Sequence, residues 1–132
     1  MMLSHSQETL LIVDDEPMMT DLFRQSMTKR GFHVLTAAGG PAAQEIVAAE
    51  GDALRLVITD MTMPGMDGVS LARVLNEKAP NLPVLIATGH ETDAEQMGLP
   101  PNVVGVVSKP YQHKALAERI RAILDNGKAQ AK

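Results

Sequence analysis

The sequence predicts an α/β domain built on one doubly wound parallel sheet. Five apolar runs of five to seven residues alternate along the chain with longer amphipathic segments, which is the pattern of repeated strand–helix–strand units. A strand that is followed by a crossover helix returns beside its predecessor in the same direction, so the strands are parallel and helices cover both faces. The length of 132 residues allows one such domain with a single sizeable core.

Each apolar run has the composition of a buried strand. Near-continuous Leu, Val, Ile and Ala content indicates strands that are covered on both faces. The five runs are 9–14 (TLLIVD), 33–37 (HVLTA), 54–60 (LRLVITD), 84–88 (VLIAT) and 103–108 (VVGVVS).

The first two helices are predicted between these runs. Pro17 suits the first turn of a helix, and Gly31 is a plausible left-handed cap at its end. The apolar side of this helix is formed by Met18, Met19, Leu22, Phe23 and Met27. After a turn at Gly39 and Gly40, a second helix over 41–50 is expected to bury Ala42, Ala43, Ile46 and Val47.

Three more helices complete the pattern. One starts at Asp67-Gly68 and stops near Ala79-Pro80. Residues 90–99 are predicted to form a short helix, and 112–126 a longer amphipathic one. The core-facing residues of the outer two are Leu71, Val74, Leu75, Leu116, Ile120, Ile123 and Leu124. Residues 1–8 and 127–132 are expected to be flexible ends around a domain over 9–126.

Composition excludes several functional classes. A formal net charge of −4 and an aromatic content of 2% argue against direct nucleic-acid binding, which uses basic surfaces and aromatic stacking. The absence of Cys excludes disulfides, thiol catalysis and cysteine metal sites. The N-terminus lacks the order of a signal peptide, and no apolar run is long enough to span a membrane. A cytoplasmic protein without a membrane segment is therefore expected.

Polar side chains gather where four of the predicted strands end. They are Asp14, Asp15, Asp60, Thr88 and Lys109. Because the carboxyl ends of parallel strands meet at one edge of the sheet, these residues should form one shallow site. Three clustered carboxylates repel one another and favour a bound cation, and hard oxygen ligands suit Mg²⁺. Asp60 taken alone could equally well be a solvated turn residue or a helix cap. Beside the other acids and Lys109 it is a candidate nucleophile toward phosphorus.

The residues from 9 to about 126 resemble the receiver domain of two-component response regulators. The resemblance rests on the Asp14-Asp15 pair, on D-x-x-M-P-G-M-D-G from Asp60 and on Lys109-Pro110. It implies a flavodoxin-like, CheY-like sheet of order 2-1-3-4-5 with five helices. It also implies that Asp60 is the phospho-acceptor and that Mg²⁺ is held by Asp14 through water, by Asp15, by Asp60 and by the carbonyl of Thr62.

The same resemblance assigns the remaining site residues and shows one departure. Thr88 is the implied switch hydroxyl, and Lys109 the implied phosphoryl contact, with a cis bond to Pro110. Many receivers carry an aromatic residue on the fifth strand where this chain has Val106, and the nearest ring is that of Tyr111. Thr62 and His90 occupy the positions that flank the route of attacking water in the family.

The function that follows is that of a phosphorylation-switched signalling module rather than an enzyme. It takes a phosphoryl group from a histidine kinase or a phosphotransfer protein and signals by binding a further, unidentified protein. Since the sequence stops after the last helix, a stand-alone receiver is expected. Two alternatives remain: a phosphorylation-independent interaction domain, and a small aspartate-nucleophile phosphohydrolase. The phosphohydrolase is disfavoured because position 62 is Thr, which cannot serve as the acid that turnover needs.

Overall fold

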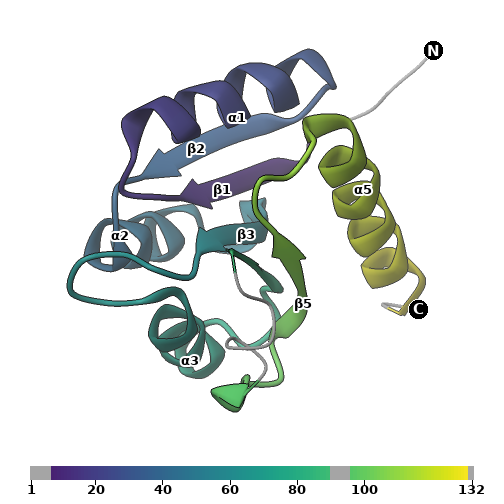
Figure 1. Cartoon of the computed structure of the whole chain (residues 1–132). Coiled ribbons are helices and arrows are strands. Elements are labelled where there is room, and N and C mark those ends of the chain that lie inside the picture. The colour runs from purple at the N-terminus through teal and green to yellow at the C-terminus, as the bar shows by residue number, and fades with distance from the viewer. Residues whose placement is uncertain (1–6, 90–95, 131–132) are drawn as a thin grey trace.

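The computed structural model of the chain describes residues 7–89 and 96–130. In the described residues strands and helices alternate as far as the fourth strand, and a fifth strand and a last helix follow it (Figure 1). The strands are β1 (Thr9–Val13), β2 (His33–Ala37), β3 (Leu54–Asp60), β4 (Val84–Thr88) and β5 (Val103–Ser108). The helices are α1 (Pro17–Lys29), α2 (Gly40–Glu50), the 3₁₀ turn η1 (Gly51–Ala53), α3 (Gly68–Lys78) and α5 (His113–Gln130).

The five strands form one parallel sheet in the order β2-β1-β3-β4-β5, so the predicted fold class and strand order are confirmed. The register aligns the carboxyl ends of neighbouring strands. Val13 pairs with both Ala37 and Thr59, and Thr88 pairs with Ser108. The residues that follow these positions therefore share one edge of the sheet, which is where the functional residues were predicted to meet.

Two apolar layers pack on opposite faces of the sheet, because side chains along a strand alternate between its faces. Leu10 and Ile12 point toward α1 and α5, whereas Leu11 and Val13 point toward α2 and α3. Phe23 of α1 and Ile120 of α5 are fully buried in the first layer. Burial of such a side chain contributes about 1.5–3 kcal/mol, so these residues fix the two helices on the sheet.

The apolar stripes of two helices are narrower than predicted. In α1 the buried residues are Thr20, Phe23 and Met27, whereas Met18 and Leu22 are 74% and 51% exposed. Ala42 of α2 is exposed as well. A single sheet face accepts only the i, i+3, i+4, i+7 side of a helix, so apolar residues beside that stripe remain in solvent.

Helix ends follow the predicted signals, with one difference. Gly31 follows α1 with φ at 95°, a left-handed conformation that glycine adopts without strain. The helix α5 continues through Gly127 to Gln130, four residues beyond the predicted end at Asn126. Glycine weakens a helix by only about 1 kcal/mol, and the following Lys, Ala and Gln are good helix formers.

Some expectations fall on parts of the chain that the structure does not describe. Residues 90–95 of the predicted short helix lie outside the described residues, as do 1–6 and 131–132 of the expected flexible ends. Within the described ranges there are four α-helices. None of the helices there has the length and hydropathy needed to cross a membrane.

Candidate functional site

Three carboxylates meet where the adjacent strands β1 and β3 end. Asp14 and Asp15 directly follow β1, and Asp60 is the last residue of β3. One carboxylate oxygen of each lies within 4.8 Å of the others. Asp14 and Asp60 are buried, whereas Asp15 faces solvent. The structure thus brings together the three acids that the sequence predicted would share one site.

A backbone amide fixes the Asp14 side chain, a contact that the sequence did not predict. The Glu16 N–H donates to Asp14 Oδ1 over 3.0 Å. An aspartate whose side chain accepts from the amide two residues later forms an Asx turn, a recognised way to begin a helix. The signal in the sequence was the aspartate three residues before Pro17 at the start of α1.

Lys109 supplies the positive charge. Its Nζ lies 3.2 Å from Asp60 Oδ1 and 3.6 Å from Asp14 Oδ2, and it donates a hydrogen bond to the Asp60 oxygen. The Lys109 N–H donates to the Thr88 carbonyl over 2.8 Å, which ties the end of β5 to the end of β4. The Lys109-Pro110 bond is cis, as the resemblance implied.

Burial and charge act in opposite directions on the two central groups. Burial raises the pKa of the Asp60 carboxyl; Lys109 opposes the rise, and Asp14 and Asp15 add to it, so the pKa remains above its usual value. Burial lowers the pKa of Lys109, but Asp60 and Asp14 outweigh that effect and the net pKa is raised. The Lys109 ammonium therefore stays protonated. The charged form of Asp60 is disfavoured by burial and by the neighbouring carboxylates, and a further cation would stabilise it.

The turn after Asp60 is held against the end of β3 by backbone contacts. The Met61 N–H donates to the Ala87 carbonyl and the Gly68 N–H to the Met61 carbonyl, both over 2.8 Å. A Cβ at Gly68 would collide with the Asp60 carbonyl oxygen, so this close return requires glycine. Asp67 caps α3 by accepting from the Ser70 N–H over 2.7 Å.

The other predicted site residues, Thr88 and Thr62, differ in their exposure to solvent. Thr88 is buried at the end of β4, and Thr62 is exposed in the turn. His90 lies outside the described residues. The described donor set consists of hard oxygen atoms at one rim, which fits the preference of Mg²⁺ for carboxylates that leave room for waters and phosphate oxygens.

Val106 and Tyr111 pack against opposite apolar layers of the sheet. Val106 is partly buried against the layer of α2 and α3. Tyr111 packs against the layer of α1 and α5, with its ring centroid 5.8 Å from that of His113. The His113 ring in turn meets the Phe23 ring edge-on at 6.5 Å. The aromatic contacts that begin two residues after Lys109 therefore lead to the α1 and α5 side.

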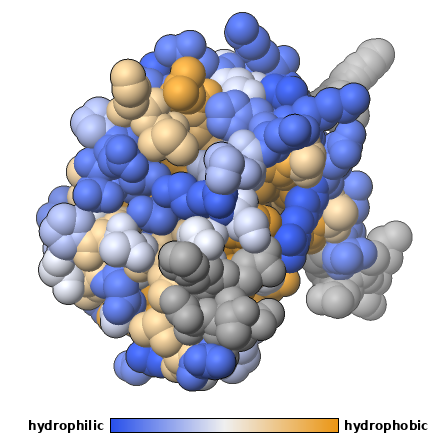
Figure 2. Space-filling view, viewed as in Figure 1, coloured by the Kyte–Doolittle hydropathy of each residue, from blue (hydrophilic) through white to orange (hydrophobic). Residues whose placement is uncertain are grey.

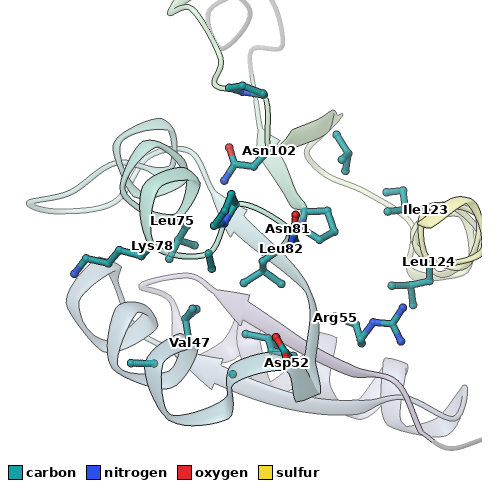
Figure 3. Close-up of a pocket in the computed structure, with 18 of the residues that line it drawn as sticks. Val47, Asp52, Arg55, Leu75, Lys78, Asn81, Leu82, Asn102, Ile123 and Leu124 are labelled. Carbon is teal, nitrogen blue, oxygen red and sulfur yellow. The ribbon is translucent and has the colours of Figure 1, made fainter. Parts of the chain in front are cut away.

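A hollow lies away from the carboxylates, at the other end of the strands. It has a volume of about 1090 Å³ and is lined by the ends of α2, α3 and α5 together with the starts of strands. Val47, Leu75, Leu82 and Leu124 line it in Figure 3. Its lining lacks the site's acids and Lys109, so the chemistry described above does not belong to it.

Comparison with known proteins identifies a family model that matches residues 10–121, that of the response regulator receiver domain. Protein PetR of Rhodobacter capsulatus is 36% identical over 123 residues, which are 93% of this chain and 51% of that protein. Sensor kinase CckA of Brucella abortus is 32% identical over 118 residues, 89% of this chain and 12% of that protein. The chain thus spans about half or less of these two relatives.

The chain is also similar in three dimensions to a solved response regulator structure. The response regulator protein TrrA of Thermotoga maritima, in complex with Mg²⁺-BeF, superposes with a TM-score of 0.77 at 25% identity. The match covers 89% of this chain and 100% of that one.

Proposed function

This chain belongs to the response regulator receiver domain family of two-component systems, and from that premise we propose that Asp60 accepts its phosphoryl group. The observation that carries the proposal is the contact of Lys109 Nζ with both Asp60 and Asp14, beside a third carboxylate. An acceptor carboxylate that lies next to both a fixed cation and a cation-binding acidic pair is the arrangement that phosphoryl transfer needs.

The proposed reaction moves one phosphoryl group between two proteins. An Asp60 carboxylate oxygen attacks phosphorus, the P–O bond of an acyl phosphate forms, and the P–N bond of the donor's phosphohistidine breaks. The electron pair of that bond returns to the imidazole nitrogen, which takes a proton from solvent. Histidine kinases and phosphotransfer proteins are the donors proposed here, since they present such a phosphohistidine.

Each residue of the site has a separate proposed task. Asp14, Asp15, Asp60 and the Thr62 carbonyl would hold Mg²⁺, with Asp14 acting through water. Mg²⁺ neutralises charge on phosphoryl oxygens when it is bound. Lys109, whose Nζ lies 3.2 Å from Asp60 Oδ1, would contact a phosphoryl oxygen, and Thr88 is the proposed hydroxyl that responds once the phosphoryl group is present.

The biological role we propose is signalling rather than turnover. Receiver domains are signalling modules, and here the receiver unit is assigned to residues 9–126. The downstream partner is proposed to be a protein, without direct contact to nucleic acid. Because histidine kinases draw on cytoplasmic ATP, the proposed compartment is the cytoplasm.

Phosphorylation from a small donor tests the proposal. The protein is incubated with acetyl phosphate and Mg²⁺, and intact mass is measured before and after mild base. We expect a base-labile phosphoryl adduct in the wild type and none in Asp60→Asn. Asp52→Asn, which removes an exposed acid far from the site, is the matched control and should be modified normally. An adduct that persists in Asp60→Asn, or continuous phosphate release at enzyme-like rates, contradicts the proposal.

A further inference from the structure

A cationic groove lies between α1 and α5, apart from the carboxylate site. It is lined by Arg30, Phe32, Lys114, Ala117, Glu118 and Arg121 and has a volume of about 410 Å³. Hydrophilic side chains cover the surface where the end of α1 meets the start of α5 (Figures 1 and 2). We call this surface the α1–α5 groove.

The charges of the groove are unbalanced. Arg30, Lys114 and Arg121 face one carboxylate, that of Glu118, in a chain whose formal net charge is −4. Across the described part of the chain, none of these three cations forms an ion pair with a carboxylate. Like charges that gather in this way repel one another, and an anionic occupant removes that repulsion.

Two of the three cations are held in place before anything binds. The Arg121 guanidinium carbon lies 4.3 Å from the centroid of the Phe32 ring, which is 1% exposed. Arg30 Nη1 donates to the Ser26 carbonyl over 3.1 Å and to its hydroxyl over 2.6 Å. Cations that are already ordered lose less side-chain entropy when an anion binds.

The spacing of the cations favours an extended acidic peptide over a single small anion. Lys114 and Arg121 are seven residues apart on α5, which corresponds to about 10 Å along the helix axis. A single phosphate would have to draw these side chains together, whereas Arg121 is stacked on Phe32 and Arg30 is bonded to Ser26. An extended chain places alternate side chains about 6.6 Å apart on the same face, so successive carboxylates can reach cations along the groove.

The groove is poorly suited to nucleic acid. Its aromatic residue, Phe32, is buried beneath Arg121 and offers no face on which a base could stack.

We propose that the α1–α5 groove binds a short acidic segment of a partner protein through Arg30, Lys114 and Arg121. The surface does not include the phospho-acceptor or its acidic neighbours, so binding does not depend on the function proposed above. Exposed charge pairs are individually weak and screened by salt. The groove therefore supplies a salt-sensitive contact that orients a partner, and Glu118 limits its strength.

Binding of a defined peptide tests the proposal with the metal-free, unphosphorylated chain. The probe is a fluorescent octapeptide of alternating Glu and Ser, compared by anisotropy with the same peptide carrying Gln or Lys in place of Glu. At about 20 mM salt we expect the Glu peptide to bind at least tenfold more tightly than the Gln peptide. We expect most of that difference to disappear at about 150 mM salt, where screening is stronger.

Variants that are expected to lower or to raise the peptide affinity locate the contact. The triple variant R30Q/K114Q/R121Q should lose about tenfold in affinity, as three exposed charge pairs would predict. Glu118→Gln should gain about two- to threefold, because it removes the groove's own competing carboxylate. Lys78→Gln is the control, since it removes one exposed cation from α3. All replaced residues are exposed, and circular dichroism verifies that each variant is folded.

Three results would overturn the proposal. Equal affinity of the wild type and the triple variant shows that the peptide binds elsewhere. Equal affinity for the Glu and Gln peptides shows that charge does not direct binding. If a single-stranded oligonucleotide binds through the three cations while the Glu peptide does not, the groove belongs to a different class of partner.

Discussion

Replacing Asp60 with asparagine is expected to make the metal-free protein more stable at pH 7. Asp60 is 9% exposed, and burial is the main reason that its pKa is raised. An asparagine has nearly the same shape, retains an oxygen that can accept the hydrogen bond from Lys109 and carries no charge to be buried. The residue proposed to carry the chemistry is thus one that the fold holds at a cost in stability.

The magnitude follows from the distances at the site. At an effective dielectric constant of about 20, the attraction of Lys109 at 3.2 Å contributes about 5 kcal/mol. Repulsion from each neighbouring carboxylate at up to 4.8 Å contributes about 3.5 kcal/mol, less for Asp15 because it is exposed. Attraction and repulsion therefore nearly cancel, and burial decides the sign. We expect a gain of about 1–2 kcal/mol in the free energy of unfolding.

The pH dependence gives an independent check on the cause. Since the pKa of Asp60 is raised in the folded state, its protonated form favours folding. That contribution is complete below the pKa of the unfolded chain and is lost as pH rises through the folded-state pKa. The stability difference between Asp60→Asn and the wild type should therefore be small in strong acid and should open as pH increases toward 7.

Urea unfolding followed by circular dichroism measures this difference, first in EDTA and then in Mg²⁺. Asp52→Asn is the control and should change stability little. Saturating Mg²⁺ at about a hundred times its dissociation constant should stabilise the wild type by about 2.7 kcal/mol, with a smaller effect on Asp60→Asn. The reasoning is wrong if Asp60→Asn is the less stable protein in EDTA at pH 7, or if the difference does not vary with pH.

Substitutions at three further positions test other parts of the site. Asp15→Ala, which removes one of the three clustered acids, should weaken Mg²⁺ binding at least tenfold by calorimetry; unchanged affinity would remove Asp15 from the ligand set. Gly68→Ala places a Cβ against the Asp60 carbonyl oxygen and should cost about 1–3 kcal/mol in urea unfolding, so a neutral result would show that the turn can move. Asp67→Ala removes the cap on the Ser70 N–H and should cost about 1 kcal/mol, whereas Asp67→Asn, which can still cap, should restore most of that loss.

The sequence by itself determined the sheet and the edge at which chemistry collects. The five apolar runs could be assigned to strands because each is short and almost wholly apolar, and the observed strands coincide with them to within one residue. Asp14, Asp60 and Lys109 could be placed together because residues that end parallel strands meet at one edge. These inferences depend on local composition and on chain direction, which a sequence contains.

Only the tertiary structure decided how the side chains share that edge. The contact of Lys109 with both Asp60 and Asp14 joins residues 49 and 95 positions apart, and no local pattern fixes such distances. The exposure of Met18 and Leu22 was also decided by tertiary packing, because the width of the buried stripe of a helix depends on the surface that the helix meets. The α1–α5 groove likewise exists only because Arg30 and Phe32, which follow α1, come to line one hollow with Arg121 of α5 when the chain folds.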